Sequence, residues 1–248
     1  MANWSDPRPT ATAFGASVPG TRGTAYDAGL RKYMLSVYNY MASGVLLTGI
    51  VALLFASGGR ESLAAQVFMA PGILKYIVMF SPLAFIMVLS FGINRLSTGA
   101  AQAIFWAFAT IMGVSMSTIF LVYTGASIAT TFFATAVAFL SLSIYGYTTK
   151  RNLQAFGTFL VMGVVGLIVA SLLNLWMQSS ALQMGISAIG VLLFAGLTAY
   201  DTQRIKEQYA YVAGSDMMGK AVIMGALSLY LDFINMFQFL LSFLGNRE

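Results

Sequence analysis

The sequence predicts an all-α polytopic membrane protein with seven transmembrane helices. Of its 248 residues, 58% are hydrophobic and only 8% are charged, whereas soluble domains average about 25% charged residues. The mean hydropathy is +0.80, and charge-free stretches of about 20 residues, enough to cross a bilayer as a helix, recur along the chain. Because lipid cannot satisfy backbone hydrogen-bonding groups, these stretches are expected to be helical.

The first 28 residues differ from the rest in composition. They are polar and rich in Gly, Pro, Ser and Thr, which predicts a disordered tail. They lack the basic start and apolar stretch of a cleavable signal sequence. The expected organisation is therefore a tail over 1–28 and one seven-helix transmembrane domain over 29–248.

Polar or charged breaks divide this domain into its spans. A loop with Gly58, Gly59 and Pro71 follows the first span, and Arg95 ends the second. Two longer charge-free stretches are divided at 123–127 and at 178–180, where small and polar residues gather. The predicted spans are 33–55, 76–94, 101–122, 128–147, 155–177, 182–201 and 221–244.

Small residues within the third span recur at the spacing of close helix contacts. Gly99, Ala103 and Ala107 form one stripe, which predicts that this face packs against another helix.

The distribution of Lys and Arg predicts the orientation of the bundle, because these residues are retained on the cytoplasmic side of short loops. With the N-terminus cytoplasmic, ten basic residues lie inside and three outside. The inner set is Arg8, Arg22, Arg31, Lys32, Arg95, Lys150, Arg151, Arg204, Lys206 and Lys220; the outer set is Arg60, Lys75 and Arg247.

The composition excludes several kinds of site. The chain has no Cys and no His, so disulfides, thiolate metal sites and histidine bases are absent. No more than two basic residues are adjacent, which argues against a nucleic-acid partner despite the net charge of +5. We expect no catalytic residues and no tightly bound cofactor; carboxylates and other oxygen ligands remain.

Two aspartates are the strongest candidates for function, because a carboxylate inside a membrane span is costly. Asp232 lies in the last span and Asp201 closes the span before it. If the sixth helix continues past Arg204, the two can pair. Two such carboxylates would share a proton, and when deprotonated they would bind a divalent cation such as Ca²⁺. We therefore predict a pH-sensing and calcium-binding pair, with protons and Ca²⁺ competing.

Three polar residues are candidates to surround this pair. Asn235 follows Asp232 by three residues on the same helical face. Tyr230 and Asn174 are further polar groups inside the spans. Each is predicted to lie beside the aspartates and to support them by hydrogen bonds.

Two motifs resemble the Bax inhibitor-1/YccA family of transmembrane Bax-inhibitor-motif proteins. They are Tyr-Asp-Thr-Gln at 200–203 and Gly-Ala-Leu-Ser-Leu-Tyr-Leu-Asp-Phe-Ile-Asn at 225–235, with Phe-Leu-Gly at 243–245. The resemblance implies a central seventh helix surrounded by six, and a pH-sensitive calcium leak controlled by Asp201 and Asp232. It implies a gating latch at Arg95, and it favours the inner membrane of a bacterium.

Two other functions are compatible with the sequence. Bacterial members of the family are associated with a membrane-bound ATP-dependent protease, so a non-transporting regulator that binds such a quality-control protease is the main alternative. Intramembrane aspartyl proteases also carry two membrane aspartates, one in a Tyr-Asp pair. Their second aspartate follows Gly-x-Gly, whereas Leu-Tyr-Leu precedes Asp232 here.

Overall fold

A computed structural model describes the backbone of residues 19–246 and the side chains of residues 26–246, and it confirms the seven membrane-spanning helices. The spans are Tyr26–Ala56, Leu74–Gly92, Thr98–Val122, Gly125–Thr148, Gln154–Met177, Ser180–Val212 and Met218–Leu244. The helices are α1 (Pro19–Ala56), η1 (Gly59–Glu61), α2 (Leu63–Phe68), α3 (Leu74–Gly92), α4 (Thr98–Met116), α5 (Ile119–Val122), α6 (Gly125–Thr148), α7 (Gln154–Met177), α8 (Ser180–Val212) and α9 (Met218–Leu244).

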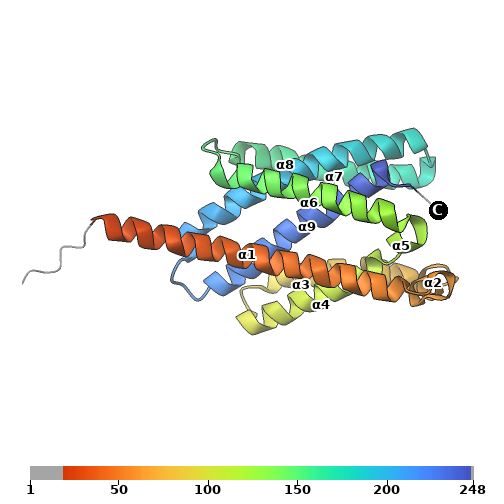
Figure 1. Ribbon diagram of the computed structural model, residues 1–248, viewed down its shortest axis with the longest axis horizontal. Coiled ribbons are helices and arrows are strands. Elements are labelled where there is room, and N and C mark those ends of the chain that lie inside the picture. The colour runs from red at the N-terminus through yellow and green to blue at the C-terminus, as the bar shows by residue number, and fades with distance from the viewer. Residues whose placement is uncertain (1–18, 247–248) are drawn as a thin grey trace, which may run out of the picture.

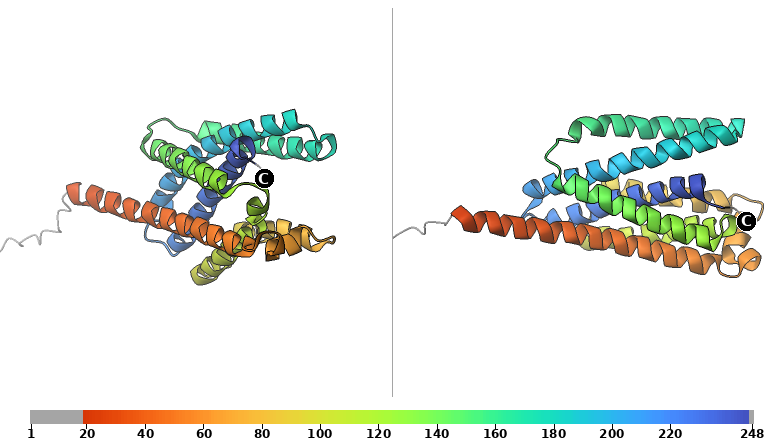
Figure 2. Two further views of the ribbon diagram at one scale, coloured as in Figure 1. Left: turned by 45° about the vertical axis from the view of Figure 1, so that its right-hand side comes forward. Right: turned by 45° about the horizontal axis from the view of Figure 1, so that its top comes forward.

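The last helix, α9, lies at the centre of the bundle. In Figure 1 it runs between a layer of α6, α7 and α8 and a layer of α1, α3 and α4, and the two further views in Figure 2 agree. It packs against α8, α1, α6 and α4, whereas α3 packs mainly on α4, and α7 on α8. Within an 18-residue apolar stretch of α9, 50% of the residues are buried, compared with 11% in the corresponding stretch of α3 and 17% in that of α7. The helices α3 and α7 therefore present most of their surface to lipid.

The predicted breaks between spans fall at residues that form turns or cap helices. Gly58, Gly59 and Gly72 adopt positive φ in the connection between α1 and α3, a conformation that glycine adopts without strain. Within this connection η1 and α2 form short helices. Thr124 caps α6 and Ser179 caps α8 through their side-chain oxygens.

Two helix boundaries differ from those expected. The helix α1 begins at Pro19, so residues 19–28 of the predicted tail are helical, with proline in the first turn where its missing N–H is tolerated; residues 1–18 lie outside the described part. The helix α8 runs to Val212 rather than ending at 201. At 1.5 Å per residue its 33 residues extend about 50 Å, beyond a hydrocarbon core of about 30 Å, so the polar stretch after Arg204 extends the helix into water.

The prediction that one small-residue face of α4 packs against another helix is wrong. Gly99, Ala103 and Ala107 are exposed, and the buried face carries other residues, among them Phe105 and Gly113. A Cβ at Gly113 would lie 2.7 Å from the carbonyl oxygen of Thr48. The close approach of α1 to α4 therefore uses the opposite face, where Gly113 lies against Thr48 and Val51 of α1.

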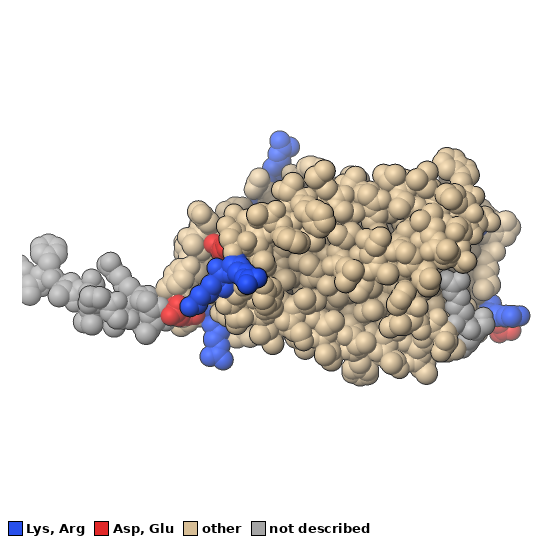
Figure 3. Space-filling model, turned by 90° about the horizontal axis from the view of Figure 1, so that it is seen from above, with Lys and Arg blue, Asp and Glu red and all other residues tan. Residues whose placement is uncertain are grey.

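Charged side chains gather at the two ends of the bundle. On the face drawn in Figure 3, a broad band without Lys, Arg, Asp or Glu separates the ends. Because successive spans alternate in direction, the end where α1 begins carries most of the basic residues, whereas Arg60 and Lys75 lie at the other end. Arg8 and Arg247, used in predicting the orientation, lie outside the described residues.

Candidate functional site

The antiparallel packing of α8 and α9 brings Asp201 and Asp232 to neighbouring levels. Gly190 of α8 faces Phe239 of α9, and Ile205 of α8 faces Gly225 of α9. This register places Asp201 opposite a position about one turn from Asp232. The extension of α8 past Arg204 is therefore what allows the two carboxylates to approach.

Both carboxylates are buried, and one oxygen of Asp232 lacks a hydrogen-bond partner among the described residues. Asp232 is 4% exposed and Asp201 is 8% exposed. The Oδ2 atom of Asp232 has no hydrogen-bond partner among the described residues. A buried polar atom without a partner costs free energy, so this atom is expected to serve something other than stability.

The cation nearest to Asp201 is Arg204. Its Nη1 lies 3.7 Å from Oδ1 of Asp201, and its side chain is 53% exposed. The sequence did not lead us to predict that Arg204 contacts Asp201, although residues three apart on a helix face can meet. Its exposed guanidinium therefore lies between Asp201 and the aqueous end of the bundle.

Close packing holds the α8 side of the pair in place. A Cβ at Gly146 of α6 would collide with the backbone of Ala199, so only glycine permits this approach of α6 to α8. Beside Asp201, the Thr202 hydroxyl lies 3.5 Å from the Ser143 hydroxyl, to which it donates. The Gln203 amide donates to the carbonyl oxygen of Arg151 at 2.8 Å. The helical segment that carries Asp201 is thus anchored to α6 and to the turn after it.

Tyr230 points away from the aspartates. Two residues along a helix correspond to a rotation of about 200°, and its hydroxyl lies 2.6 Å from that of Thr48 on α1. The hydroxyl of Thr48 in turn donates to the carbonyl oxygen of Ala109. The ring packs against Phe105 and Phe108. Tyr230 therefore joins α9 to α1 and α4 rather than surrounding the aspartates.

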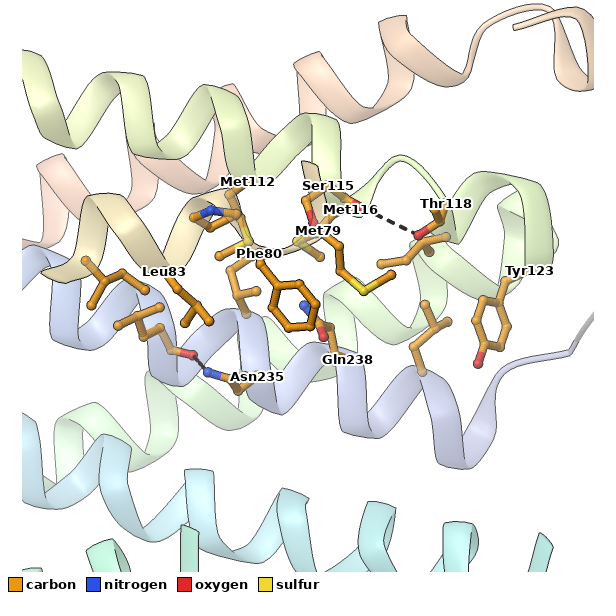
Figure 4. Close-up of a pocket in the computed structure, with 16 residues that line it drawn as sticks. Met79, Phe80, Leu83, Met112, Ser115, Met116, Thr118, Tyr123, Asn235 and Gln238 are labelled. Carbon is orange, nitrogen blue, oxygen red and sulfur yellow. Dashed lines mark hydrogen bonds between the residues drawn. The ribbon is translucent and has the colours of Figure 1, made fainter. Parts of the chain in front are cut away.

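Asn235 lies one turn beyond Asp232 and lines a groove of about 640 Å³ between α3, α4, α5 and α9. Figure 4 shows it together with Gln238 on α9, across the groove from Phe80 and Met112. Its amide donates to the carbonyl oxygen of Leu231 on its own helix at 2.8 Å. Asn235 makes no hydrogen bond to either aspartate.

The structure places Asn174 far from the aspartates. It lies in the last turn of α7, where its amide donates to Gln183 at 3.0 Å and its oxygen accepts from the Ser179 N–H. Gln183 is 18 positions before Asp201 on α8, a separation of about 27 Å along the helix. Asn174 therefore belongs to a polar cluster at the other end of the bundle.

Arg95 lies in the turn between α3 and α4 and is exposed. Among the described residues it makes no ion pair with either aspartate; the only ion pair in this part of the chain is between Arg204 and Asp201. Its part as a latch stays a prediction.

The oxygen ligands at the pair are few. No group of three or more Asp, Glu, His or Cys residues capable of holding a metal occurs among the described residues. Ca²⁺ takes six to eight oxygen ligands, so two carboxylates would need water and other oxygens to complete its coordination.

Comparison with known proteins extends over almost the whole chain. Residues 30–248 match the family described as "Inhibitor of apoptosis-promoting Bax1". An uncharacterized protein of Rickettsia prowazekii is 46% identical over 92% of this chain and 95% of its own length. The inner membrane protein YbhL of Escherichia coli K12 is 43% identical over 89% of this chain and 94% of its own.

Proposed function

The chain belongs to the Bax inhibitor-1/YccA family of multi-pass membrane proteins, and we propose that it provides a passive, pH-sensitive pathway for calcium ions, with Asp201 and Asp232 as the sensor. The observation that carries this proposal is the burial of both carboxylates on adjacent helices, with Oδ2 of Asp232 left without a partner in the described part of the chain. Carboxylates in this position are expensive and are typically functional.

Protons and calcium ions compete for the same oxygens in this proposal. With one proton shared, one carboxyl can donate a hydrogen bond to the other, and the pair carries one negative charge. With both groups deprotonated, two negative charges face each other and favour a divalent cation. Calcium binding is therefore expected to strengthen as the pH rises.

Two arginines have separate parts in the proposal. Arg204 contacts Asp201 in this conformation and offsets part of its charge. Arg95 is proposed as a gating latch that reaches the pair in another conformation, since it lies apart from both aspartates here.

We further propose that the N-terminus is cytoplasmic and that the membrane is a bacterial inner membrane. The bundle end where α1 begins carries most of the basic residues, and these residues are retained on the cytoplasmic side. The relative from Escherichia coli is described as an inner membrane protein.

The test is calcium flux into proteoliposomes over a pH series. Wild type is compared with Asp232→Asn at matched incorporation, because asparagine keeps the shape and cannot ionise. Asp216→Asn is the matched control, since it removes the same charge at an exposed position between α8 and α9. We expect pH-dependent flux in the wild type and in the control, and no pH dependence in Asp232→Asn.

Two results would change the proposal. Flux that responds to pH in Asp232→Asn as in the wild type would remove the sensor from this residue. No flux from correctly folded wild-type protein would favour the alternative proposal, a non-transporting regulator of a membrane-bound ATP-dependent protease. Loss of binding to such a protease after deletion of residues 1–25 would support that regulator.

A further inference from the structure

An apolar groove between α1 and α6 has an arginine at one end. Its volume is about 410 Å³. It is lined by Met34, Leu35, Tyr38, Leu140, Ser143, Ile144, Tyr147 and Arg31. Because α1 and α6 run in opposite directions, Arg31 and Tyr147 lie toward the basic end of the bundle, and Tyr38 and Leu140 lie deeper.

The charge of Arg31 is not compensated within the described residues. Its side chain is exposed, and it forms no ion pair there, not even with Asp27 one helical turn before it. A second cation is held nearby: Nζ of Lys206 donates to the carbonyl oxygen of Tyr147 at 2.7 Å and lies 4.9 Å from the centre of its ring. The end of the groove is therefore positive.

A second apolar groove provides a comparison. It has a volume of about 290 Å³ and is lined by residues of α1, α4, α5, α6 and α9, without any charged side chain. Such a surface can hold a hydrocarbon chain but cannot select a headgroup. The groove between α1 and α6 combines a comparable apolar surface with a cation at the level where a lipid phosphate would lie.

We propose that this groove binds an anionic glycerophospholipid, with one acyl chain along α1 and α6 and the phosphate at Arg31. The apolar side chains of the groove would contact the acyl chain. Arginine at a membrane boundary extends its charge toward the interface while its stem stays apolar, so Arg31 can reach the phosphate. The positive end accounts for the preference for an anionic headgroup. The floor of the groove, Ser143, is hydrogen-bonded to Thr202, the residue that follows Asp201.

The first experiment measures the dissociation constants of individual lipids by native mass spectrometry on delipidated protein in detergent. Phosphatidylglycerol and phosphatidylcholine with identical acyl chains are the probes. We expect tighter binding of phosphatidylglycerol by the wild type, and about fivefold weaker binding of it by Arg31→Gln, since one basic side chain near a membrane surface contributes about that factor. Arg60→Gln, an exposed arginine at the other end, should bind both lipids as the wild type does.

A second pair of variants tests the apolar part. Leu140 is 57% exposed and lines the groove, whereas Leu192 on α8 is 72% exposed and faces lipid elsewhere. Leu140→Trp fills the groove and should weaken phosphatidylglycerol binding, while Leu192→Trp should not. Equal affinity of the wild type for the two lipids would overturn the proposal, as would equal losses in Arg31→Gln and Arg60→Gln or in the two tryptophan variants.

Discussion

Two polar sites lie along the buried helices α8 and α9, one of them joined by Asn174 of α7, and they differ in how their hydrogen bonds are satisfied. At one site, Asp201 and Asp232 are buried, and Oδ2 of Asp232 has no partner within residues 26–246. At the other, an end cluster of amides and hydroxyls bonds within itself. Its members are Asn174, Gln183, Ser187 and Ser242, with distances of 3.0 Å between Asn174 and Gln183, 3.3 Å between Gln183 and Ser242, and 3.1 Å between Ser187 and Ser242.

The difference follows from the chemistry of the side chains. Amides and hydroxyls both donate and accept, so a few of them can satisfy one another. Ionised carboxylates only accept, so two of them together need a proton or a cation from outside. The end cluster therefore satisfies its own hydrogen bonds and can stabilise the fold, whereas the aspartate pair has only Arg204 beside Asp201 and leaves Oδ2 of Asp232 without a partner among the described residues.

The largest expected effect is a pair of stability changes with opposite signs. Asp232→Leu should raise the free energy of unfolding by about 1–3 kcal/mol, because a buried acidic group without a partner is replaced by an apolar one. Gln183→Leu should lower it by about 1–2 kcal/mol, because Asn174 loses an acceptor and Ser242 loses a donor. Unfolding of the protein in mixed micelles by added SDS measures both.

Asp232→Asn is the control for shape in that experiment, since it keeps the size and a polar group. If Asp232→Leu destabilised the protein more than Gln183→Leu did, the aspartate would be structural, and the contrast between the two sites would fail.

The sequence was sufficient to predict the spans and to identify the two aspartates as candidates, because both predictions depend on the free-energy cost of placing a charge within the bilayer. Charges end apolar stretches, and a lone carboxylate within a span stands out wherever it lies. The aspartate neighbourhood was harder to predict. Tyr230 lies near Asp232 in sequence but faces Thr48, and Asn174 lies at the other end of the bundle. Polarity identifies candidates, whereas depth and helix rotation determine which of them meet.

Helix ends in water were also beyond prediction from hydropathy. The stretch after Arg204 is polar and lies outside the predicted span 182–201, but it continues α8 to Val212. Outside the bilayer a polar helix costs no transfer energy, so composition no longer distinguishes a helix from a loop there. Pairing of the aspartates required this continuation, and the register of α8 and α9 places Asp201 opposite a position about one turn from Asp232.

A smaller effect is expected from removing a buried tyrosine hydroxyl, and its size should depend on whether that hydroxyl has a hydrogen-bond partner. The Tyr230 hydroxyl contacts Thr48 at 2.6 Å, whereas the buried Tyr33 hydroxyl has no partner among the described residues. Tyr230→Phe should therefore lower the free energy of unfolding by about 1 kcal/mol, and Tyr33→Phe should leave it unchanged or raise it slightly. The same SDS titration applies, and equal losses in both variants would show that hydrogen-bond satisfaction does not distinguish these positions.

The smallest effect concerns the arginines around the aspartates. Because the Arg204 side chain is half exposed and its ion pair is long at 3.7 Å, Arg204→Gln should change the free energy of unfolding by less than about 1 kcal/mol. Without this cation, a second negative charge at the pair is less favourable, so the midpoint of the flux response should move to higher pH. Arg95→Gln, measured in the same proteoliposomes, separates the two arginines: as a latch formed in another conformation, Arg95 should affect the magnitude of flux more than its midpoint. A midpoint shift in Arg95→Gln as large as that in Arg204→Gln would instead mean that both cations act on the carboxylates in the resting protein.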